Sequence, residues 1–175
     1  ATTILGMPGY VYHLLRIAKE EKINLSSVNK VILGGERVDK GLREKLRSFL
    51  GNKARILSTY GFTEGKCVWG QCNENSGYHL YTDLEYIEIV DKNGENVEEG
   101  KGEIVYTALD WRGSVVLRYK TGDLVDGIYY DKCDCGRTLR LGNKIERTSE
   151  VKEFNLVKLK GNLVNLNVFY SIINF

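Results

Sequence analysis

Residues 28–61, VNKVILGGERVDKGLREKLRSFLGNKARILSTYG, alternate short apolar runs with glycine-containing corners. Residues 28–33 predict a short buried strand that ends on Gly34-Gly35. Asp39 is a good N-cap for a helix over residues 40–50, which Gly51 then ends. Residues 54–57 predict a second strand. Strand, helix and strand at this spacing predict a βαβ unit with parallel strands.

The pattern on either side of this unit completes the fold class. Residues 4–22 carry apolar side chains close to a 3.6-residue repeat and predict a helix. After residue 77 the chain changes to short strands separated by Gly and Asn turns, which we expect at residues 84–90, 102–108 and 115–119. The fold class is therefore α/β, with a parallel βαβ section at 1–77 followed by an antiparallel β-rich section at 78–146.

Composition excludes several classes of protein. The chain has 175 residues, of which 42% are hydrophobic and 27% charged, and this balance excludes intrinsic disorder. No apolar run is long enough for a membrane span, and the first residues lack the pattern of a signal peptide. A formal net charge of +2 gives no electrostatic argument for a nucleic-acid partner.

Three glycine-containing corners carry polar and aromatic side chains. They are 34–36 (Gly-Gly-Glu), 60–65 (Tyr-Gly-Phe-Thr-Glu-Gly) and 119–123 (Tyr-Lys-Thr-Gly-Asp). Ligands bind at the carboxyl ends of strands in open α/β sheets, and glycine lets the backbone approach a flat ring or a phosphate. Each corner alone is weak evidence, because most such corners are structural. Together and in this order they favour a nucleotide site.

The order Tyr60-Gly-Phe-Thr-Glu64, Gly102-Glu103 and Tyr119-Lys-Thr-Gly-Asp123 resembles that of the adenylate-forming (AMP-binding) enzymes, and within them the phenylacetate–CoA ligase-like branch. The resemblance implies that residues 1–146 are the second half of a large AMP-binding domain. It implies that residues 147–175 hold the hinge and the start of a small C-terminal lid domain.

The resemblance also implies a role for individual residues. Gly34, Gly35 and Glu36 would lie along adenine, with Tyr60 stacked on the ring and Gly61 and Phe62 completing the motif. Thr63 and Glu64 would be the catalytic pair, Thr63 bonding the α-phosphate and Glu64 holding Mg²⁺. Asp123 would accept hydrogen bonds from both ribose hydroxyls, and Arg147 would contact the ribose or phosphate at the hinge. A carboxylate suits a vicinal diol, and a hard oxygen ligand suits Mg²⁺.

Three departures from the family pattern bear on activity. The family's phosphate loop and its C-terminal lysine do not occur in these 175 residues, and Arg147 lies farther from Gly161 than the family's hinge arginine lies from its glycine. We therefore expect this segment alone to be inactive.

The parent reaction implied by the resemblance has two steps. ATP and a carboxylic acid give acyl-AMP and pyrophosphate, and the thiol of CoA, the co-substrate, then gives acyl-CoA and AMP. We expect a cytoplasmic protein without nucleic-acid or membrane partners, and a homodimer for the full-length chain. The alternative is a zinc-stabilised nucleotide-binding or interaction module without catalysis.

Four side chains have the composition of a zinc site. Cys72, His79, Cys133 and Cys135 form a Cys₃His set suited to tetrahedral Zn²⁺, and four protein ligands make such a site structural. The Cys-x-Cys loop at 133–135 also resembles a loop of phenylacetate-ligase relatives. Free buried thiols are the alternative, and Cys67 could replace His79 as the fourth ligand.

Overall fold

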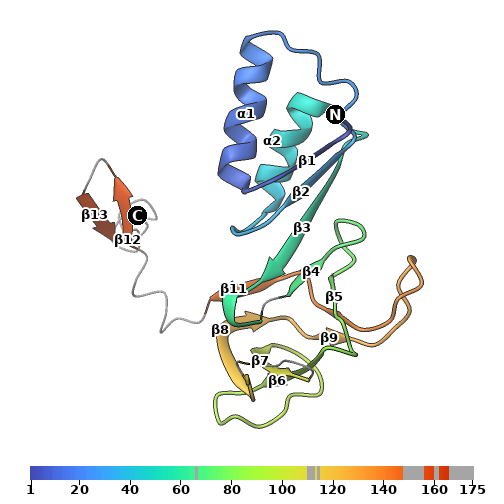
Figure 1. The fold of residues 1–175 in the computed structure, drawn as a ribbon, viewed down its shortest axis with the longest axis vertical. Helices are drawn as coiled ribbons and strands as arrows, with labels where there is room; N and C mark the ends of the chain where they lie inside the picture. Colours follow the sequence, from blue (N-terminus) through green and yellow to red (C-terminus); the bar gives the residue numbers. More distant parts are fainter. Residues whose placement is uncertain (66, 110–112, 114, 148–155, 160–161, 166–175) are drawn as a thin grey trace.

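The computed structural model describes residues 1–65, 67–109, 113, 115–147, 156–159 and 162–165. Its first half consists of a four-stranded sheet in the order β1-β2-β3-β4 with two helices (Figure 1). The elements are β1 (Thr3–Gly6), α1 (Pro8–Glu20), β2 (Lys30–Leu33), α2 (Lys40–Leu50), β3 (Arg55–Gly61) and β4 (Val68–Gly70). Strands β1, β2 and β3 are parallel, which confirms the predicted βαβ unit.

Both predicted ends of α2 are confirmed. The Asp39 carboxylate accepts a hydrogen bond from the backbone N–H of Leu42 at 2.7 Å, and Gly51 follows the last helical residue with φ of 89°. The N-terminal helix is shorter than expected, because residues 3–6 form strand β1 beside β2. Pro8 then occupies the first turn of α1, where its missing N–H is not needed. Apolar periodicity alone did not distinguish a parallel edge strand from the start of a helix.

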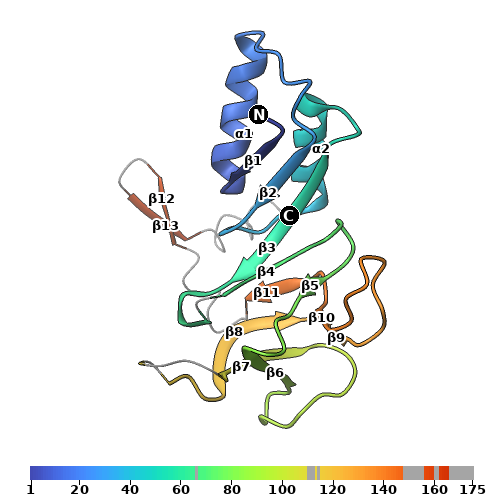
Figure 2. The ribbon, with the colours of Figure 1, turned by 45° about the vertical axis from the view of Figure 1, so that its right-hand side comes forward.

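The second half is antiparallel, as predicted. It holds a four-stranded sheet in the order β11-β8-β7-β6 and a three-stranded sheet in the order β5-β10-β9. The strands are β5 (Tyr78–His79), β6 (Glu85–Val90), β7 (Gly102–Ala108), β8 (Tyr119–Val125), β9 (Ile128–Tyr129), β10 (Arg140–Leu141) and β11 (Ile145–Arg147). A further pair, β12 (Leu156–Leu159) and β13 (Asn162–Asn165), forms a two-stranded ladder. Seen from a second direction, β3 extends from the helical layer to the β-rich section (Figure 2).

Strand β8 begins later than the sequence predicted. Val115 and Leu117 are 76% and 67% exposed, whereas alternate residues from Thr121 onward face inward. The buried Thr121 hydroxyl donates to the carbonyl of Ile104 at 2.9 Å, so a polar side chain fits this strand without loss of hydrogen bonding. The corner predicted at residues 119–123 is therefore part of strand β8.

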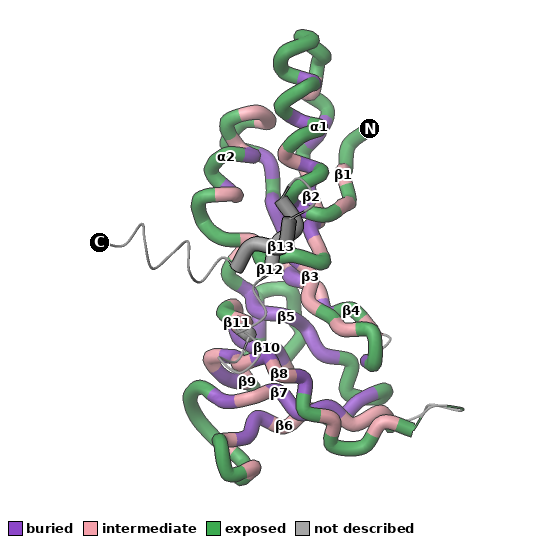
Figure 3. The backbone as a smooth tube through the Cα atoms, turned by 90° about the vertical axis from the view of Figure 1, so that its left-hand side faces the viewer, coloured by how far each residue is buried: buried purple, intermediate pink, exposed green. Residues whose placement is uncertain are grey.

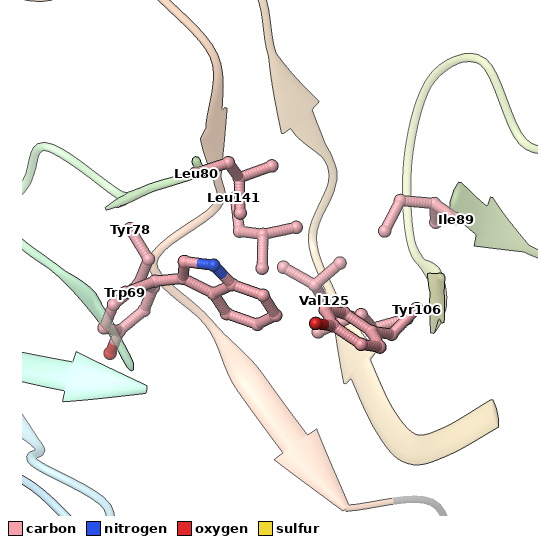
Figure 4. Packing of buried hydrophobic residues seen from close by; sticks show 8 residues of the cluster. Trp69, Tyr78, Leu80, Ile89, Tyr106, Val125 and Leu141 are labelled. Atoms are coloured by element: carbon pink, nitrogen blue, oxygen red, sulfur yellow. The ribbon is translucent and has the colours of Figure 1, made fainter. Parts of the chain in front are cut away.

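Two hydrophobic clusters form the core. One lies between the helices and the parallel strands and includes Leu15, Leu33 and Leu46. The other, in the β-rich section, surrounds Trp69 and Tyr106, both fully buried (Figure 4). Figure 3 shows buried residues gathered along the inner strands, with exposed residues over the helices' outer faces and the loops.

The predicted hinge and lid segment falls mostly outside the described residues, which include only positions 147, 156–159 and 162–165 of it. Within the part that the structure describes, no helix is both long and apolar enough to cross a membrane.

Candidate functional site

A cleft of about 640 Å³ opens at the carboxyl ends of β2 and β3 and reaches across to β8 and β11. Its volume is in the range usual for small-molecule sites. The lining comes from five separate parts of the chain: residues 35–40, 59–61, 78, 123 and 143–146. Of the predicted nucleotide residues, the lining includes Gly35, Glu36, Tyr60, Gly61 and Asp123.

The Gly34-Gly35 corner is shaped by a close backbone approach. A Cβ on Gly34 would lie 2.5 Å from Thr59 Oγ1, and that hydroxyl donates to the carbonyl of Leu33 at 3.2 Å. Gly35 has φ of +82°, a conformation that favours glycine. The corner therefore turns directly after β2 and presents backbone, rather than side chains, to the cleft.

Glu36 contributes to a helix end as well as to the cleft. Its carboxylate accepts a hydrogen bond from the backbone N–H of Gly9 at 3.1 Å, in the first turn of α1. The N-cap residue of that helix, Met7, makes no side-chain cap bond. Glu36, 27 residues from Gly9 in the sequence, thus supplies the capping acceptor that the residues next to the helix do not provide.

Tyr60 and Asp123 meet in the wall of the cleft. The Tyr60 hydroxyl donates to Asp123 Oδ2 at 2.9 Å, although the two residues lie 63 positions apart. Asp123 is only 5% exposed, and its backbone N–H donates to Thr121 Oγ1 at 3.1 Å. A buried carboxylate held beside an aromatic ring gives the cleft one strong hydrogen-bond acceptor and one flat apolar surface.

Thr63 and Glu64 lie just beyond the lining. They are exposed on a single 3₁₀ turn, η1 (Thr63–Gly65), which follows β3 directly. Phe62 points the other way and packs against Trp69, Tyr106 and Tyr119. The motif therefore divides into two parts, an aromatic anchor in the core and an exposed hydroxyl–carboxylate pair at the surface.

Arg147 is the last residue of β11, and its register partner in β8 is Asp123. The backbone of the predicted hinge arginine is thus directly opposite the predicted ribose carboxylate. The rest of the hinge, 148–150, lies outside the described residues.

Sequence reasoning missed Asn143 and Tyr78 in the lining. Asn143 Oδ1 accepts from Gln71 Nε2 and from the backbone of Gly77, both at 2.9 Å. The Tyr78 hydroxyl lies 2.8 Å from Ser58 Oγ. Neither residue belongs to a local motif. The long-range pairing of β5 with β10 brings both of them to the cleft.

The buried Arg43 side chain is bonded to residues next to this wall of the cleft. The Arg43 guanidinium, on α2, donates to the carbonyl of Ile56 and, at 3.1 Å, to Gln71 Oε1. Burial lowers the pKa of Arg43, and nearby Glu74 partly opposes that shift. The buried face of α2 thus contains a charged side chain beside Leu46, and this side chain anchors β3 and Gln71.

Cys72, His79, Cys133 and Cys135 form one cluster. Their ligand atoms all lie within 4.8 Å of one another. Cys72 Sγ is 3.5 Å from Cys133 Sγ, and Cys135 Sγ is 3.5 Å from His79 Nε2. With zinc–ligand bonds of about 2.0–2.3 Å, tetrahedral geometry requires ligand separations of roughly 3.5–3.8 Å. The donor set therefore fits a tetrahedral metal ion, and two of the ligand separations already match that geometry.

The protonation of His79 also suits metal binding. Burial, together with the positive charges of Arg137 and Arg140, lowers the pKa of His79 and favours the neutral imidazole that coordinates metals. His79 Nδ1 is buried and, in the part of the chain that the structure describes, has no hydrogen-bond partner. A backbone hydrogen bond from Arg137 lowers the pKa of the Cys135 thiol, whereas burial raises that of Cys72.

Cys67 lies apart from this cluster. Its thiol donates to Glu85 Oε2 at 3.0 Å, and burial together with this carboxylate raises the pKa of Cys67 to about 12. The residue that completes the cluster beside the three other cysteines is His79.

Comparison with known proteins places these features in a family context. The model of the AMP-binding enzyme family matches residues 1–108. A phenylacetate-coenzyme A ligase of Thermus thermophilus is 36% identical over 131 residues, which make up 71% of this chain and 29% of that enzyme.

Solved structures of 2-hydroxyisobutyryl-CoA ligase share the fold. The open conformation, in complex with 2-HIB-AMP and CoA, has a TM-score of 0.72 and 23% identity, covering 99% of this chain and 38% of the other. The thioesterification state has a TM-score of 0.74 and 24% identity, with 99% and 37% covered. The chain thus spans well under half the length of these relatives.

Proposed function

Because the chain belongs to the AMP-binding enzyme family, we propose that it is a segment of an ATP-dependent acid–CoA ligase. The full protein would activate a carboxylic acid as acyl-AMP and then transfer the acyl group to the thiol of CoA. The observation that carries this proposal is the cleft wall in which Tyr60 and the buried Asp123 are joined by a hydrogen bond. An aromatic face and a carboxylate so close together suit the base and the diol of a nucleoside.

We assign the nucleoside to the cleft. Adenine lies along the Gly34–Glu36 corner with its face on Tyr60, and Asp123 accepts hydrogen bonds from the ribose hydroxyls. The close packing of Gly34 on Thr59 supports this assignment, because it leaves a thin backbone edge beside the cleft. The backbone of Arg147 pairs with that of Asp123 in the β8–β11 ladder, which supports a place for this residue near the ribose.

Thr63 and Glu64 would act on the phosphates. The Thr63 hydroxyl would donate to the α-phosphate, and the exposed Glu64 carboxylate is the kind of oxygen ligand that Mg²⁺ takes. When bound, Mg²⁺ would neutralise phosphate charge as pyrophosphate leaves. These residues contribute by positioning and electrostatics, since the reactive bond is the nucleotide's own anhydride.

For the acid we propose an aryl acid of the phenylacetate class. The support is the 36% identity to a phenylacetate-coenzyme A ligase. A panel of aryl and short aliphatic acids, offered to the full-length gene product, tests this assignment. Preference for short aliphatic acids would contradict it and leave the ligase class intact.

AMP binding by the 175-residue chain tests the nucleotide site. We expect a dissociation constant on the order of millimolar, measured by NMR titration, because only part of the family's contacts is present. Asp123→Ala should weaken binding about tenfold or more, since the ribose loses a charged acceptor. Asp83→Ala, on an exposed turn before β6, is the matched control and should change nothing. Equal affinities for all three proteins would refute the site.

Turnover distinguishes the ligase from a non-catalytic nucleotide-binding or interaction module. We expect no acid-dependent ATP–pyrophosphate exchange from this chain alone, because loss of one preorganised electrostatic contact already costs roughly 10²–10³ in rate. The full-length gene product should catalyse the exchange. A full-length protein that binds AMP but never exchanges pyrophosphate would favour the module.

We further propose a structural zinc ion held by Cys72, His79, Cys133 and Cys135. The support is their mutual distance, the neutral imidazole favoured at His79 and four cysteines free of disulfides. Zinc would join Cys72 and strand β5 to the loop between β9 and β10. A reducing compartment such as the cytoplasm would keep these thiols available.

Elemental analysis tests the zinc proposal. Protein purified without added metal should contain about one zinc per chain, as expected for a single four-ligand site. Cys133→Ser should lose the metal and melt at a lower temperature, whereas Cys67→Ser should retain it because Cys67 bonds Glu85 instead. Metal-free wild-type protein that melts at the same temperature as the zinc form would defeat the claim.

A further inference from the structure

A buried polar network lies directly behind the exposed Thr63–Glu64 turn. The Tyr106 hydroxyl donates to the carbonyl of Gly65 at 3.0 Å, and Tyr106 itself is fully buried. Gly65 immediately follows Glu64, so this bond fixes the peptide plane at the end of η1 (Thr63–Gly65). A Cβ on Gly65 would lie 2.8 Å from the Phe62 ring, which shows how closely the turn packs on its anchor.

The segment that follows the turn is held by Glu85. This carboxylate is 4% exposed and accepts hydrogen bonds from Trp69 Nε1, from the backbone N–H of Tyr81 at 2.8 Å and from Cys67 Sγ at 3.0 Å. Cys67 and Trp69 belong to the segment in which the chain returns from the turn into β4. One buried anion thus gathers three donors from the returning segment and the loop before β6.

The aromatic rings connect the residue before the turn, Phe62, to the segment that follows it. Phe62 meets Tyr106 edge to face, with ring centroids 5.3 Å apart, and meets Trp69 at 5.7 Å. Figure 4 shows Trp69 between Tyr78 on one side and Tyr106 with Val125 on the other. Gly61 closes the loop, because its Cβ would lie 2.6 Å from the carbonyl of Cys67.

We propose that Tyr106 and Glu85 are positioning residues for the Thr63–Glu64 turn, holding the Thr63 hydroxyl where the α-phosphate of a bound nucleotide lies. The inference rests on the proposed function, because it needs a nucleotide in the cleft that Gly61 lines. Tyr106 and Glu85 act through the turn and do not touch the nucleotide themselves. Their expected effect is therefore on the phosphate contact and not on the nucleoside.

Comparing AMP with adenosine isolates that contact. Wild-type chain should bind AMP more tightly than adenosine, and Thr63→Ala should remove most of this preference. Tyr106→Phe, which deletes one hydroxyl, should lower AMP affinity about three- to tenfold while adenosine affinity stays the same. Glu85→Gln should also lower AMP affinity and leave adenosine affinity the same. The new amide NH₂ group would face a hydrogen-bond donor that the carboxylate oxygen accepts from in the wild type. Tyr86→Phe and Glu88→Gln, also on β6, are the matched controls and should leave both affinities unchanged.

A double variant separates positioning from general stability. In a Thr63→Ala background, Tyr106→Phe should have no further effect on the AMP-to-adenosine ratio, because the group that it positions is gone. Two outcomes would overturn the proposal. In the first, Tyr106→Phe leaves the AMP-to-adenosine affinity ratio at the wild-type value. In the second, it changes this ratio equally in the wild-type and the Thr63→Ala backgrounds.

A second pair covers the case in which Tyr106→Phe does not fold. Cys67→Ala removes one donor to Glu85 and should reduce the ratio, whereas Cys67→Ser retains a donor and should restore it. Equal ratios for these two variants would also overturn the proposal. Failure of the proposed function looks different, because the wild-type chain would then bind neither adenosine nor AMP.

Discussion

Gly34 has no space for a side chain, and the obstacle is one atom. A Cβ there would lie 2.5 Å from Thr59 Oγ1 but 3.9 Å from Thr59 Cβ, an ordinary contact. The hydroxyl cannot move away freely, because it donates to the carbonyl of Leu33. Thr59 also lines the cleft, so strain at this contact would reach the proposed nucleotide site.

We expect Gly34→Ala to lower the free energy of unfolding by about 1–3 kcal/mol, as overpacking does elsewhere. Adding Thr59→Ala should recover part of this loss, because the clashing oxygen is then absent. Gly70→Ala is the control, since its Cβ would meet Thr59 Cγ2 at 4.0 Å. Urea unfolding of the wild type, the three single variants Gly34→Ala, Thr59→Ala and Gly70→Ala, and the double variant measures the effect. Additive losses in the double variant would show that Thr59 is not the obstacle.

At the scale of elements, helix α1 begins without a cap of its own. Met7 makes no side-chain cap bond, and the first turn of the helix contains no acidic residue. Glu36, from the corner after β2, supplies the acceptor and a negative charge at the positive end of the helix. The helix start and the cleft corner are therefore linked through one carboxylate.

Replacing that carboxylate should destabilise the helix more than the site. We expect Glu36→Ala to cost about 0.5–1 kcal/mol of unfolding free energy, in the range of lost N-caps. Glu36→Gln keeps an acceptor and should cost less, and it should leave AMP affinity unchanged. Glu98→Ala, in an exposed loop, is the control for stability. A large loss of AMP affinity in Glu36→Gln would show that the carboxylate contacts the nucleotide.

Local signals predicted the elements whose ends are marked in the sequence. Asp39 and Gly51 define α2 because capping depends on neighbours a few residues away. The predictions for the residues of β1 and for the start of β8 were wrong. The limits of these strands depend on pairing with β2 and β7, and a local sequence pattern does not contain information on that pairing. The same reason applies to the cleft, where Tyr60 was predicted and Asn143 was not.

At the scale of the whole molecule, long-range side-chain bonds join the α/β section to the β-rich section. Tyr60 bonds Asp123, Gln71 bonds Asn143, and Trp69 bonds Glu85. Strand β4 and Trp69 belong by sequence to the first section and by packing to the core of the second. The core of the β-rich section is therefore incomplete without Trp69 of the α/β section.

We expect these shared contacts to make unfolding one cooperative transition over residues 1–146. In calorimetry the van't Hoff enthalpy should equal the calorimetric enthalpy. Removing metal with a chelator should lower the melting temperature, because ligand release destabilises the native state, and the transition should stay single. Two resolved transitions would show that the sections fold independently.

The hydrogen bond between Tyr60 and Asp123 has a consequence for synthesis of the chain. The residues are separated by 63 positions, and at about 5–20 residues per second the ribosome adds Asp123 about 3–13 s after Tyr60. During this interval Tyr60, Phe62 and Trp69 have been made while Tyr106, against which Phe62 and Trp69 pack, is still to come or has just been added. The nascent chain thus exposes an aromatic surface for several seconds, and chaperones at the ribosome exit have that time to bind it before β7 and β8 emerge.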